Sequence, residues 1–310
     1  MSDAAFYTVS NRDFFLGAVG LVNSLRLVGH REPIVLLDCG LTGEQRELLA
    51  PEVNLVDGPD DVAPNLLKAI APLRKPAHAV VLIDADMIAT RAMTELIDLA
   101  AGGDVAAPAT GMDRFLPEWG ELLDLGPMRP KPYVCSGLVF LGGALGAEVL
   151  RLMDERKDRV DFELTYWRRN VQGYPLVHAD QDLLNAVLAA RVPEERITVL
   201  EGRLAIAPPF RGLRLVDERT LECAFEDGTE PYVVHHWNAK PWLQPTHDGV
   251  YSRLLRRLLV GADVPVKVPE RQIPLRLRSG MLASAERKRI NARERLRRRV
   301  REPLARIRSS

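Results

Sequence analysis

Two carboxylates, Asp84 and Asp86, directly follow the apolar run at residues 79–83 and carry the strongest chemical signal in the chain. An uninterrupted apolar run of this kind predicts a strand that is buried on both faces. Because ligands of open α/β sheets bind beyond the carboxyl ends of the strands, the two acids lie where a site is expected. One intervening residue lets both carboxylates approach the same hard cation, which would bridge them to a diphosphate. A pair of strand-end acids, one of them capping a helix, is the competing interpretation.

A second acidic motif, DQDLLN at residues 180–185, opens a predicted helix. Helix physics explains part of this motif, because Asp180 is predicted as the N-cap and Asp182 interacts favourably with the helix dipole. Gln181 and Asn185 have no such explanation, although either could be solvated. The motif is therefore a candidate for ligand binding as well as for helix initiation.

A third motif, HHWNAKPW at residues 235–242, follows the apolar residues Tyr232–Val234. The imidazole of a histidine at a strand end is a common ligand for a borderline cation such as manganese. Lys240 would supply a positive charge for a phosphate group. For His235 alone, a core histidine beside aromatic packing residues is the favoured interpretation. Together with the two strand-end acids, however, the motif completes a set of groups that suits a metal ion and a phosphate.

Strand-like and helix-like segments alternate along the chain before and between these motifs. Strands are predicted at 6–9, 33–37, 53–56 and 79–83, and helices at 15–27, 44–49 and 65–73. Thr42 is the predicted cap of the second helix. Buried strands separated by helices indicate an α/β fold with a mostly parallel central sheet and helices on both faces.

The pattern continues to about Val260 and then changes. Further elements are predicted at 133–141 (a strand interrupted by Ser136-Gly137), 144–156, 181–190 and 232–234. After that point, prolines at 265, 269 and 274 break any long element, and an Arg-rich run follows. We therefore predict one domain at 1–260 and a basic C-terminal extension at 261–310 that is partly helical or disordered.

A formal net charge of zero conceals a strong charge asymmetry. Residues 275–310 hold 13 Lys and Arg against 3 Asp and Glu, and the rest of the chain holds 29 against 39. This separation predicts an anionic partner for the extension. A basic amphipathic helix on an anionic membrane surface and a solvated or disordered tail are equally supported. Nucleic acid is not expected as a partner, because the segment has no Phe, Tyr or Trp to stack on bases.

The remaining composition, 46% hydrophobic and 27% charged, is ordinary for a globular protein. The three cysteines, Cys39, Cys135 and Cys223, show no metal-ligand or disulfide spacing, which suits a reducing compartment. The N-terminal residues contain no basic region followed by an apolar run, and no stretch reaches the roughly 18 apolar residues of a membrane span. We therefore expect a cytoplasmic protein, whose extension could attach it peripherally to the inner face of the membrane.

The motifs occur in the same order in glycosyltransferase family 8, which includes glycogenin and the bacterial lipopolysaccharide galactosyltransferases. The chain resembles that family over roughly residues 4–245. The resemblance rests on Asp84-Ala85-Asp86 after VVLI, Ser136-Gly137 in a strand, DQDLLN, HHWNAKPW, and Thr8-Val9-Ser10-Asn11 at the first strand. It implies a GT-A fold and a retaining transferase that uses a nucleotide sugar, usually UDP-linked, bound through manganese or magnesium.

The resemblance also implies a metal-ligand set. Asp84, Asp86 and one of the two histidines, His235 or His236, would bind the cation. His235 is preferred because the family's ligand directly follows an apolar strand. The spacing from histidine to Lys-Pro-Trp is shorter here than is usual in the family, so both histidines stay candidates.

Other residues would contact the donor. By the same resemblance, the nucleoside pocket would be lined by Thr8, Ser10 and Asn11, the diphosphate would face Lys68 and Lys240, and the donor site would include Ser136 and Gly137. Asp180 and Gln181 would lie beside the transferred sugar and stabilise its oxocarbenium-like carbon.

Several functional questions stay open at the level of sequence. Cys135 stands where the family usually has an Asn that helps to bind the donor sugar, so the donor is not identified. The acceptor could be a glycan, a lipid-linked intermediate or a small metabolite. The main alternative is a non-catalytic protein that binds a sugar nucleotide. A nucleotidyltransferase is less well supported, because residues 9–12 (VSNR) are not a Gly-rich phosphate loop.

Overall fold

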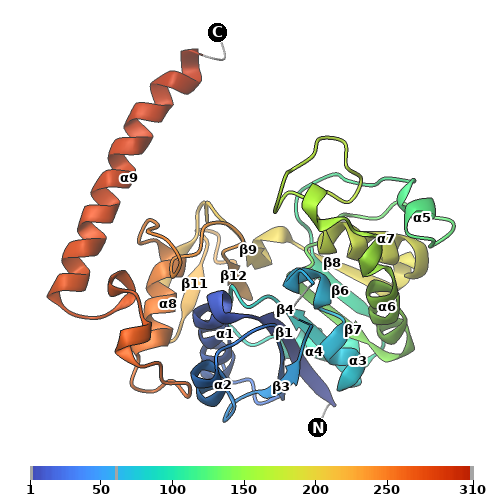
Figure 1. Ribbon diagram of the computed structural model, residues 1–310, viewed down its shortest axis with the longest axis horizontal. Helices are drawn as coiled ribbons and strands as arrows, with labels where there is room; N and C mark the ends of the chain where they lie inside the picture. The colour runs from blue at the N-terminus through green and yellow to red at the C-terminus, as the bar shows by residue number, and fades with distance from the viewer. Residues whose placement is uncertain (1–2, 60–61, 308–310) are drawn as a thin grey trace.

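A seven-stranded sheet forms the centre of the computed structural model, which describes residues 3–59 and 62–307 (Figure 1). Its strands lie in the order β3 (Asn54–Asp57), β2 (Ile34–Asp38), β1 (Ala4–Ser10), β4 (Ala79–Ile83), β7 (Leu138–Gly142), β6 (Val105–Pro108) and β8 (Ile197–Leu200). In this sheet β7 runs antiparallel to both of its neighbours, whereas the other four pairings are parallel. The predicted α/β fold with a mostly parallel sheet is confirmed.

Helices cover both faces of this sheet. They are α1 (Phe15–Leu27), α2 (Gly43–Leu49), α3 (Ile70–Arg74), α4 (Thr94–Ala101), α5 (Trp119–Leu122), α6 (Gly143–Arg156), α7 (Asp180–Arg191) and α8 (Val250–Val260). A further helix, α9 (Met281–Ile307), extends away from the sheet (Figure 1). Alternate residues of each strand enter two separate cores. Phe6 and Val81 pack on the side of α1 and α8, while Tyr7 and Val80 pack on the side of α3, α6 and α7. Burial on both faces explains why these strands are continuous apolar runs.

A smaller sheet lies at the carboxyl end of β4 and combines β5 (Met87–Ala89), β12 (Val233–His235) and β9 (Ala205–Ile206). β12 runs antiparallel to β5, with His235 paired to Met87. This register brings the last residue of β12 beside the turn that carries the two strand-end acids. A separate hairpin is formed by β10 (Arg214–Asp217) and β11 (Glu222–Ala224).

The helix predicted at 65–73 is wrong in one respect, because the segment is broken. A 3-10 turn at Pro64–Leu67 is followed, after Lys68 and Ala69, by the short helix α3. Pro72 has no N–H to donate to the carbonyl of Lys68, so a continuous helix would lose that hydrogen bond. The break leaves Lys68 at a turn beside the carboxyl end of the sheet.

The predicted strand at 133–141 is also shorter than expected. β7 begins only at Leu138, and before it Val134 makes a single bridge to Ala109. Ser136 and Gly137 therefore lie in the irregular segment that leads into the strand. Their backbone and side chains are available to the site described below.

The first part of the predicted extension packs on the body of the protein. Val266 and Leu277 are buried in the same core as α1 and α8. Asn23, which is buried in α1, donates to the carbonyls of Leu258 (2.9 Å) and Val266 (3.0 Å) and accepts from the Val266 N–H (2.9 Å). The boundary at 260/261 stays a prediction.

The second part of the extension is the helix α9, which extends away from the rest of the molecule (red in Figure 1). Its first turns contact the body, since Ala283 and Ile290 are buried. Within the described residues, no helix has the length and apolar character needed to cross a membrane. Residues 308–310, at the end of the predicted tail, lie outside the described part of the chain.

A buried histidine makes the stability of this fold depend on pH. His30 lies with Nδ1 3.0 Å from Glu32 Oε2, while its Nε2 accepts from the Met93 N–H at 3.0 Å, so the ring is neutral. Burial lowers the pKa of His30, and this outweighs the opposing effect of Glu32. Because the depressed pKa favours the unfolded state once the ring is protonated, this stability is present above about pH 6.5 and is lost as the pH falls.

We therefore expect the free energy of unfolding, measured by urea denaturation, to fall as the pH is lowered from about 7.5 to about 5.5 (about one unit either side of the ordinary histidine pKa). In His30→Gln, which keeps an acceptor for Met93 but cannot titrate, this pH dependence should become shallower. An identical pH dependence in both proteins would show that His30 is not its source.

Candidate functional site

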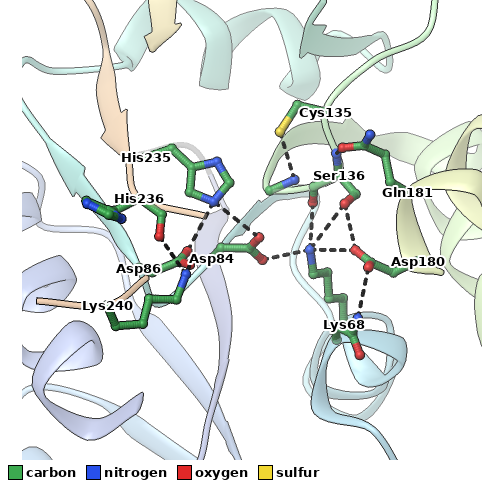
Figure 2. Close-up of polar contacts among 12 residues, drawn as sticks. Lys68, Asp84, Asp86, Cys135, Ser136, Asp180, Gln181, His235, His236 and Lys240 are labelled. Atoms are coloured by element: carbon green, nitrogen blue, oxygen red, sulfur yellow. Dashed lines mark hydrogen bonds and ion pairs between the residues drawn. The ribbon is translucent and has the colours of Figure 1, made fainter. Parts of the chain in front are cut away.

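Three potential metal ligands meet at the carboxyl end of β4 (Figure 2). One ligand atom from each of Asp84, Asp86 and His235 lies within 4.8 Å of the other two. No other group of three potential metal ligands lies this close together in the part of the chain that the structure describes. His235 Nε2 lies 3.2 Å from Asp86 Oδ1 and 4.0 Å from Asp84 Oδ2. Two carboxylates and an imidazole suit a divalent cation such as manganese or magnesium.

The surroundings of these three side chains fit a cation. Asp86 Oδ1 is buried and has no hydrogen bond of acceptable geometry among the described residues, although His235 is close. Without a metal, the charge of this oxygen is met only by the His235 ring, and a divalent cation between the two groups would replace that contact. Gly137 closes the site from the other side. A methyl group there would lie 2.6 Å from Met87 Cε, 2.8 Å from Asp84 Oδ2 and 3.1 Å from His235 Cε1, so the residue type preserves the space.

His236 lies differently from His235. Its ring packs against Tyr251 and Phe210, with ring centroids 4.9 and 5.7 Å away. Burial and the nearby charge of Lys240 lower the pKa of His236 to about 4, so the ring is neutral at physiological pH. Of the two candidate histidines, the structure groups His235 with the acids. His236 instead contacts the site through its backbone, because its N–H donates a hydrogen bond to the carbonyl of Asp86 at 3.1 Å.

Two buried lysines neutralise the acids of the site. Lys68 Nζ lies 2.7 Å from Asp84 Oδ1 and 2.8 Å from Asp180 Oδ2. Lys240 forms an ion pair with Asp86 and donates to the carbonyl of His236 at 2.5 Å. Burial alone would lower the pKa of Lys68, but its two carboxylate partners raise it, so this ammonium group is charged.

Burial and neighbouring charges also shift the pKa values of Asp84, Asp86 and His235. Burial would raise the pKa of Asp86, but His235 and Lys240 hold it well below its usual range. Burial raises the pKa of Asp84, and the charge of Lys68 offsets this only in part. Burial would lower the pKa of His235, but Asp86 raises it to about 10. The site is therefore a compact set of charges of both signs, with His235 protonated.

Asp180 and Gln181 face this set from the start of α7. The Ser136 hydroxyl donates to Asp180 Oδ2 at 2.6 Å, and the Ser136 N–H donates to Gln181 Oε1 at 3.3 Å. Lys68 also donates to the Ser136 carbonyl at 3.1 Å. Thus Lys68, Asp84, Ser136, Asp180 and Gln181, which are widely separated in sequence, form one continuous polar network (Figure 2).

The interpretation of Asp180 as a helix N-cap is wrong. The N-cap position is occupied by Ala179, and Asp180 is the first residue of the helix with its carboxylate turned to Lys68 and Ser136. Ala179 has φ +50°, which is unfavourable for a residue with a Cβ. This strained entry into α7 is part of what orients Asp180 and Gln181 towards the site.

Asp182 holds the strained entry in place. Its side chain is fully buried and accepts hydrogen bonds from the Tyr133 hydroxyl (2.6 Å), the guanidinium of Arg114 (2.7 and 3.1 Å) and the His178 N–H (2.7 Å). Asn185, one turn later, bonds both the N–H and the carbonyl of Val134. Sequence analysis missed Arg114 and Tyr133, and no local pattern indicates them, because their partners lie far along the chain.

The predicted nucleoside residues lie at the carboxyl end of β1. Thr8 Oγ1 is buried and has no partner among the described residues. The Ser10 hydroxyl donates to the Asn11 carbonyl, and Asn11 Oδ1 accepts from the N–H groups of Asp13 and Phe14. Asn11 is thus the cap of the 3-10 turn Arg12–Phe14. Its role in nucleoside binding stays a prediction, as do those of Thr8 and Ser10.

Cys135 lies between the network and the metal-ligand set. Its sulfur accepts from the Gly137 N–H at 3.4 Å, and its contact with His235 adds to the raised pKa of that ring. An amide at this position could donate hydrogen bonds that a thiol makes only weakly. The identity of the donor sugar is therefore not fixed by this residue.

Comparison with known structures places this arrangement in a known fold. The galactosyltransferase LgtC, in complex with donor and acceptor sugar analogues, is similar over 86% of this chain and 98% of its own, with a TM-score of 0.51 and 15% identity. An active-site mutant of LgtC gives a TM-score of 0.52 with 14% identity over the same shares of the two chains. This chain has the GT-A glycosyltransferase fold. The predicted fold class is thereby confirmed.

A third similar structure is the apo form of the bifunctional glycosyltransferase WbbM, with a TM-score of 0.53 and 16% identity. The match covers 85% of this chain, which spans half the length of the WbbM chain. No model of a protein family and no curated protein sequence matches this chain. At these identities the GT-A likeness concerns the fold alone.

The Asp182 network predicts a large effect of one substitution on stability. Asp182→Asn removes a buried charge and leaves the partly buried guanidinium of Arg114 without its counterion. We expect the free energy of unfolding to fall by about 2–3 kcal/mol, below the usual cost for a fully buried pair because Arg114 retains some exposure. Urea denaturation measures the change.

The matched control for this experiment is Asp104→Asn, which breaks an exposed ion pair with Arg196. Solvent screening limits its expected effect to less than about 1 kcal/mol. Equal losses in the two variants would show that Asp182 does not anchor the start of α7.

Proposed function

We propose that the protein is a glycosyltransferase that takes a sugar from a nucleotide-diphosphate donor, with UDP-linked sugars as the expected donors. The observation that carries this proposal is the group formed by Asp84, Asp86 and His235 at the carboxyl end of β4 in a GT-A fold. The opposite wall of the same site presents Asp180 and Gln181.

The charges of the site support joint binding of a cation and a diphosphate. The carboxylates of Asp84, Asp86 and Asp180 are balanced by two lysines and the protonated His235. If Asp84, Asp86 and His235 bind a divalent cation, His235 gives up its proton, because only the neutral ring has a nitrogen lone pair for the metal. The lysines then lose carboxylate partners and become available for phosphate oxygens. A cation bound there would neutralise the diphosphate and polarise its oxygens. We infer manganese or magnesium as the cation, because the ligands are oxygen and nitrogen atoms.

The proposed reaction exchanges one bond for another at the anomeric carbon of the donor sugar. The bond from this carbon to the donor phosphate oxygen breaks, and a bond to an acceptor hydroxyl oxygen forms. The hydroxyl proton passes to the leaving phosphate oxygen. Attack on the same face as departure would retain the anomeric configuration. Lys68 and Lys240 would stabilise the negative charge that develops on the diphosphate.

Asp180 and Gln181 would stabilise the electron-poor sugar carbon. Both carboxylate oxygens of Asp180 are already engaged, Oδ2 by Ser136 and Lys68 and Oδ1 by Asn65 at 3.3 Å. A carboxylate with this many donors is a poor nucleophile, because each hydrogen bond stabilises its charge. The contacts therefore support an electrostatic role for Asp180 rather than a covalent intermediate.

A donor-binding experiment tests whether Asp84, Asp86 and His235 form a metal-dependent donor site. The melting temperature of the full chain would be measured with UDP-glucose, UDP-galactose, UDP-N-acetylglucosamine and GDP-mannose, each with and without MnCl₂. A donor at a hundred times its Kd adds about 2.7 kcal/mol of stability, a shift of about 4 °C for a chain of this size. We expect such a shift with one donor class, only when the cation is present.

Two variants make the assignment specific. Asp86→Asn should abolish the cation-dependent shift, and Gly137→Ala should reduce it, because the added methyl group displaces Asp84 and His235. Gly43→Ala is the matched control, since nothing lies within 4 Å of its added methyl group. If no nucleotide sugar raises the melting temperature of the unmodified chain, the likeness concerns only the fold and the proposed function is overturned.

A non-catalytic protein that binds a sugar nucleotide would show the same melting shift. Release of free nucleotide diphosphate from the stabilising donor, followed with and without candidate acceptors, separates the two functions. Turnover that disappears in Asp86→Asn supports the transferase, whereas a stable complex without product supports the binding protein.

We also propose that α9 associates with an anionic membrane surface. The helix extends away from the body, and at its start Met281 is 90% and Leu282 77% exposed. Its described side chains include the exposed cations Lys288, Arg289 and Arg293. Apolar residues beside exposed cations suit the boundary between headgroups and acyl chains. A peripheral location on the inner face of the membrane and cytoplasmic residence remain parts of this proposal.

Vesicle sedimentation tests the role of α9. We expect binding to phosphatidylglycerol–phosphatidylcholine vesicles, weaker at high salt, and about a hundredfold weaker in the K288E/R289E/R293E variant, since each basic residue contributes about 1 kcal/mol. The control variant K75E/R211E/R214E reverses as many exposed cations on the body. Equal binding to pure phosphatidylcholine, or equal loss in both variants, would contradict the proposal.

A further inference from the structure

Two exposed aromatic side chains lie outside the network described above. All Phe, Tyr and Trp residues fall in the described part of the chain, and among them Tyr166 (43%) and Trp167 (46%) are the exposed ones. Their rings contact each other edge to face, with centroids 5.4 Å apart. Aromatic rings left in water forgo the free energy of burial, so an adjacent exposed pair indicates a surface that a ligand covers.

These two rings belong to a larger group. The Tyr166 ring lies 6.3 Å from the ring of Trp237 and 6.4 Å from that of His178, measured between centroids. We refer to Tyr166, Trp167, His178 and Trp237 as the aromatic cluster. Its members come from the loop before α7 and from the segment after β12, so it joins two parts of the chain that are distant in sequence.

The loop that carries Tyr166 and Trp167 has a defined structure. Thr165 is fully buried, and its hydroxyl donates to the Phe162 carbonyl at 2.7 Å. The N–H of Tyr166 donates to the Val177 carbonyl at 2.7 Å, and that of Asn170 to the Thr165 carbonyl at 2.8 Å. The two exposed rings are therefore displayed by a folded support, which favours binding because little order remains to be imposed.

The aromatic cluster adjoins both walls of the candidate site. Trp237 follows the metal-ligand candidate His235 by two residues, and His178 precedes Asp180 by two. Two residues of chain reach at most about 7 Å, so the backbone at Trp237 and at His178 lies close to groups of the site. The His178 ring also lies 6.4 Å from that of Tyr133, whose hydroxyl donates to Asp182. A molecule resting on the aromatic cluster would thus approach the position proposed for the reacting sugar carbon.

The chemistry of the aromatic cluster indicates what it binds. A pyranose ring has an apolar face of C–H groups and a rim of hydroxyls, which suits flat aromatic rings flanked by polar groups. The ring nitrogens of His178 have no hydrogen-bond partner in the described residues and could bind hydroxyls. The neighbours Glu163, Arg168 and Arg169 are exposed and charged, which disfavours a lipid chain as the occupant.

We propose that the aromatic cluster binds a pyranose ring of the acceptor, so that the acceptor is a glycoside. Its role as an acceptor subsite rests on the proposed glycosyltransferase function, whereas sugar binding itself requires neither donor nor cation. The ring would stack on Tyr166, Trp167 and Trp237 and direct a hydroxyl towards the sugar carbon beside Asp180 and Gln181.

Fluorine NMR of the full chain labelled with 5-fluorotryptophan tests this proposal. The chain has four tryptophans, and Trp119 and Trp242 are buried, so they serve as internal controls. Methyl glycosides of glucose, galactose, N-acetylglucosamine and mannose would be titrated without donor or cation. We expect at least one of them to shift the signals of Trp167 and Trp237 and to leave those of Trp119 and Trp242 unchanged. Sorbitol, a polyol without a ring face, should shift none.

Variants then separate stacking from other effects. Tyr166→Ala should weaken glycoside binding by about tenfold or more, the loss of one good ring contact, whereas Tyr166→Phe should stay within about twofold. Leu282→Ala, on exposed α9, should have no effect. Asp86→Asn should lose donor binding and keep glycoside binding, so failure of the donor site and failure of the aromatic cluster are distinguishable.

Three results would overturn the proposal. The first is that no glycoside shifts Trp167 or Trp237 up to its solubility limit. The second is that sorbitol shifts them equally, which would indicate a non-specific solvent effect. The third is that only glycosides with a long alkyl chain shift them, which would make the aromatic cluster a lipid contact.

Discussion

The structure around the site depends on balancing charge that is buried away from water. Asp84, Asp86 and Asp180 lie within one small region, and isolated carboxylates in such surroundings would be strongly disfavoured. Lys68 and Lys240 reach them from two different elements, and His235 carries a proton as the third cation. Each positive group contacts at least one acid. The surrounding fold must therefore bring together six side chains from distant parts of the sequence.

Several irregularities of the backbone follow from that requirement. Pro72 interrupts the helix near Lys68, Gly137 leaves room for a carboxylate and an imidazole, and Ala179 adopts an unfavourable conformation at the start of α7. Regular structure on either side compensates for the cost. β12 aligns His235 through its pairing with β5, and Asp182 fastens the entry to α7 with four hydrogen bonds. The strain is thus concentrated where ligands would bind, as is common at functional sites.

The sequence was informative where the signal is local. Continuous apolar runs identified the strands of the sheet, and the acids at the end of 79–83 identified its functional edge, because both depend on neighbouring residues only. It was less informative where partners are distant. The pairing of Asp182 with Arg114 and Tyr133 spans 68 and 49 residues, so Asp180 was assigned to helix capping and Asp182 to the helix dipole. The ring contact between Tyr166 and Trp237 likewise has no local signature. The choice between His235 and His236 needed the register of β12 against β5.

Asn23 has a consequence for how the chain reaches this structure. Its amide is buried in the first long helix, yet all its partners belong to residues 258 and 266. During synthesis from the N-terminus, α1 therefore presents an unsatisfied polar group and an uncovered apolar face until Val266 has emerged from the ribosome. The half of the core beneath α8 can close only after residues up to Leu277 have been made. The opposite half, built from α3, α6 and α7, needs nothing beyond about Val199, so the two faces of one sheet mature at different times.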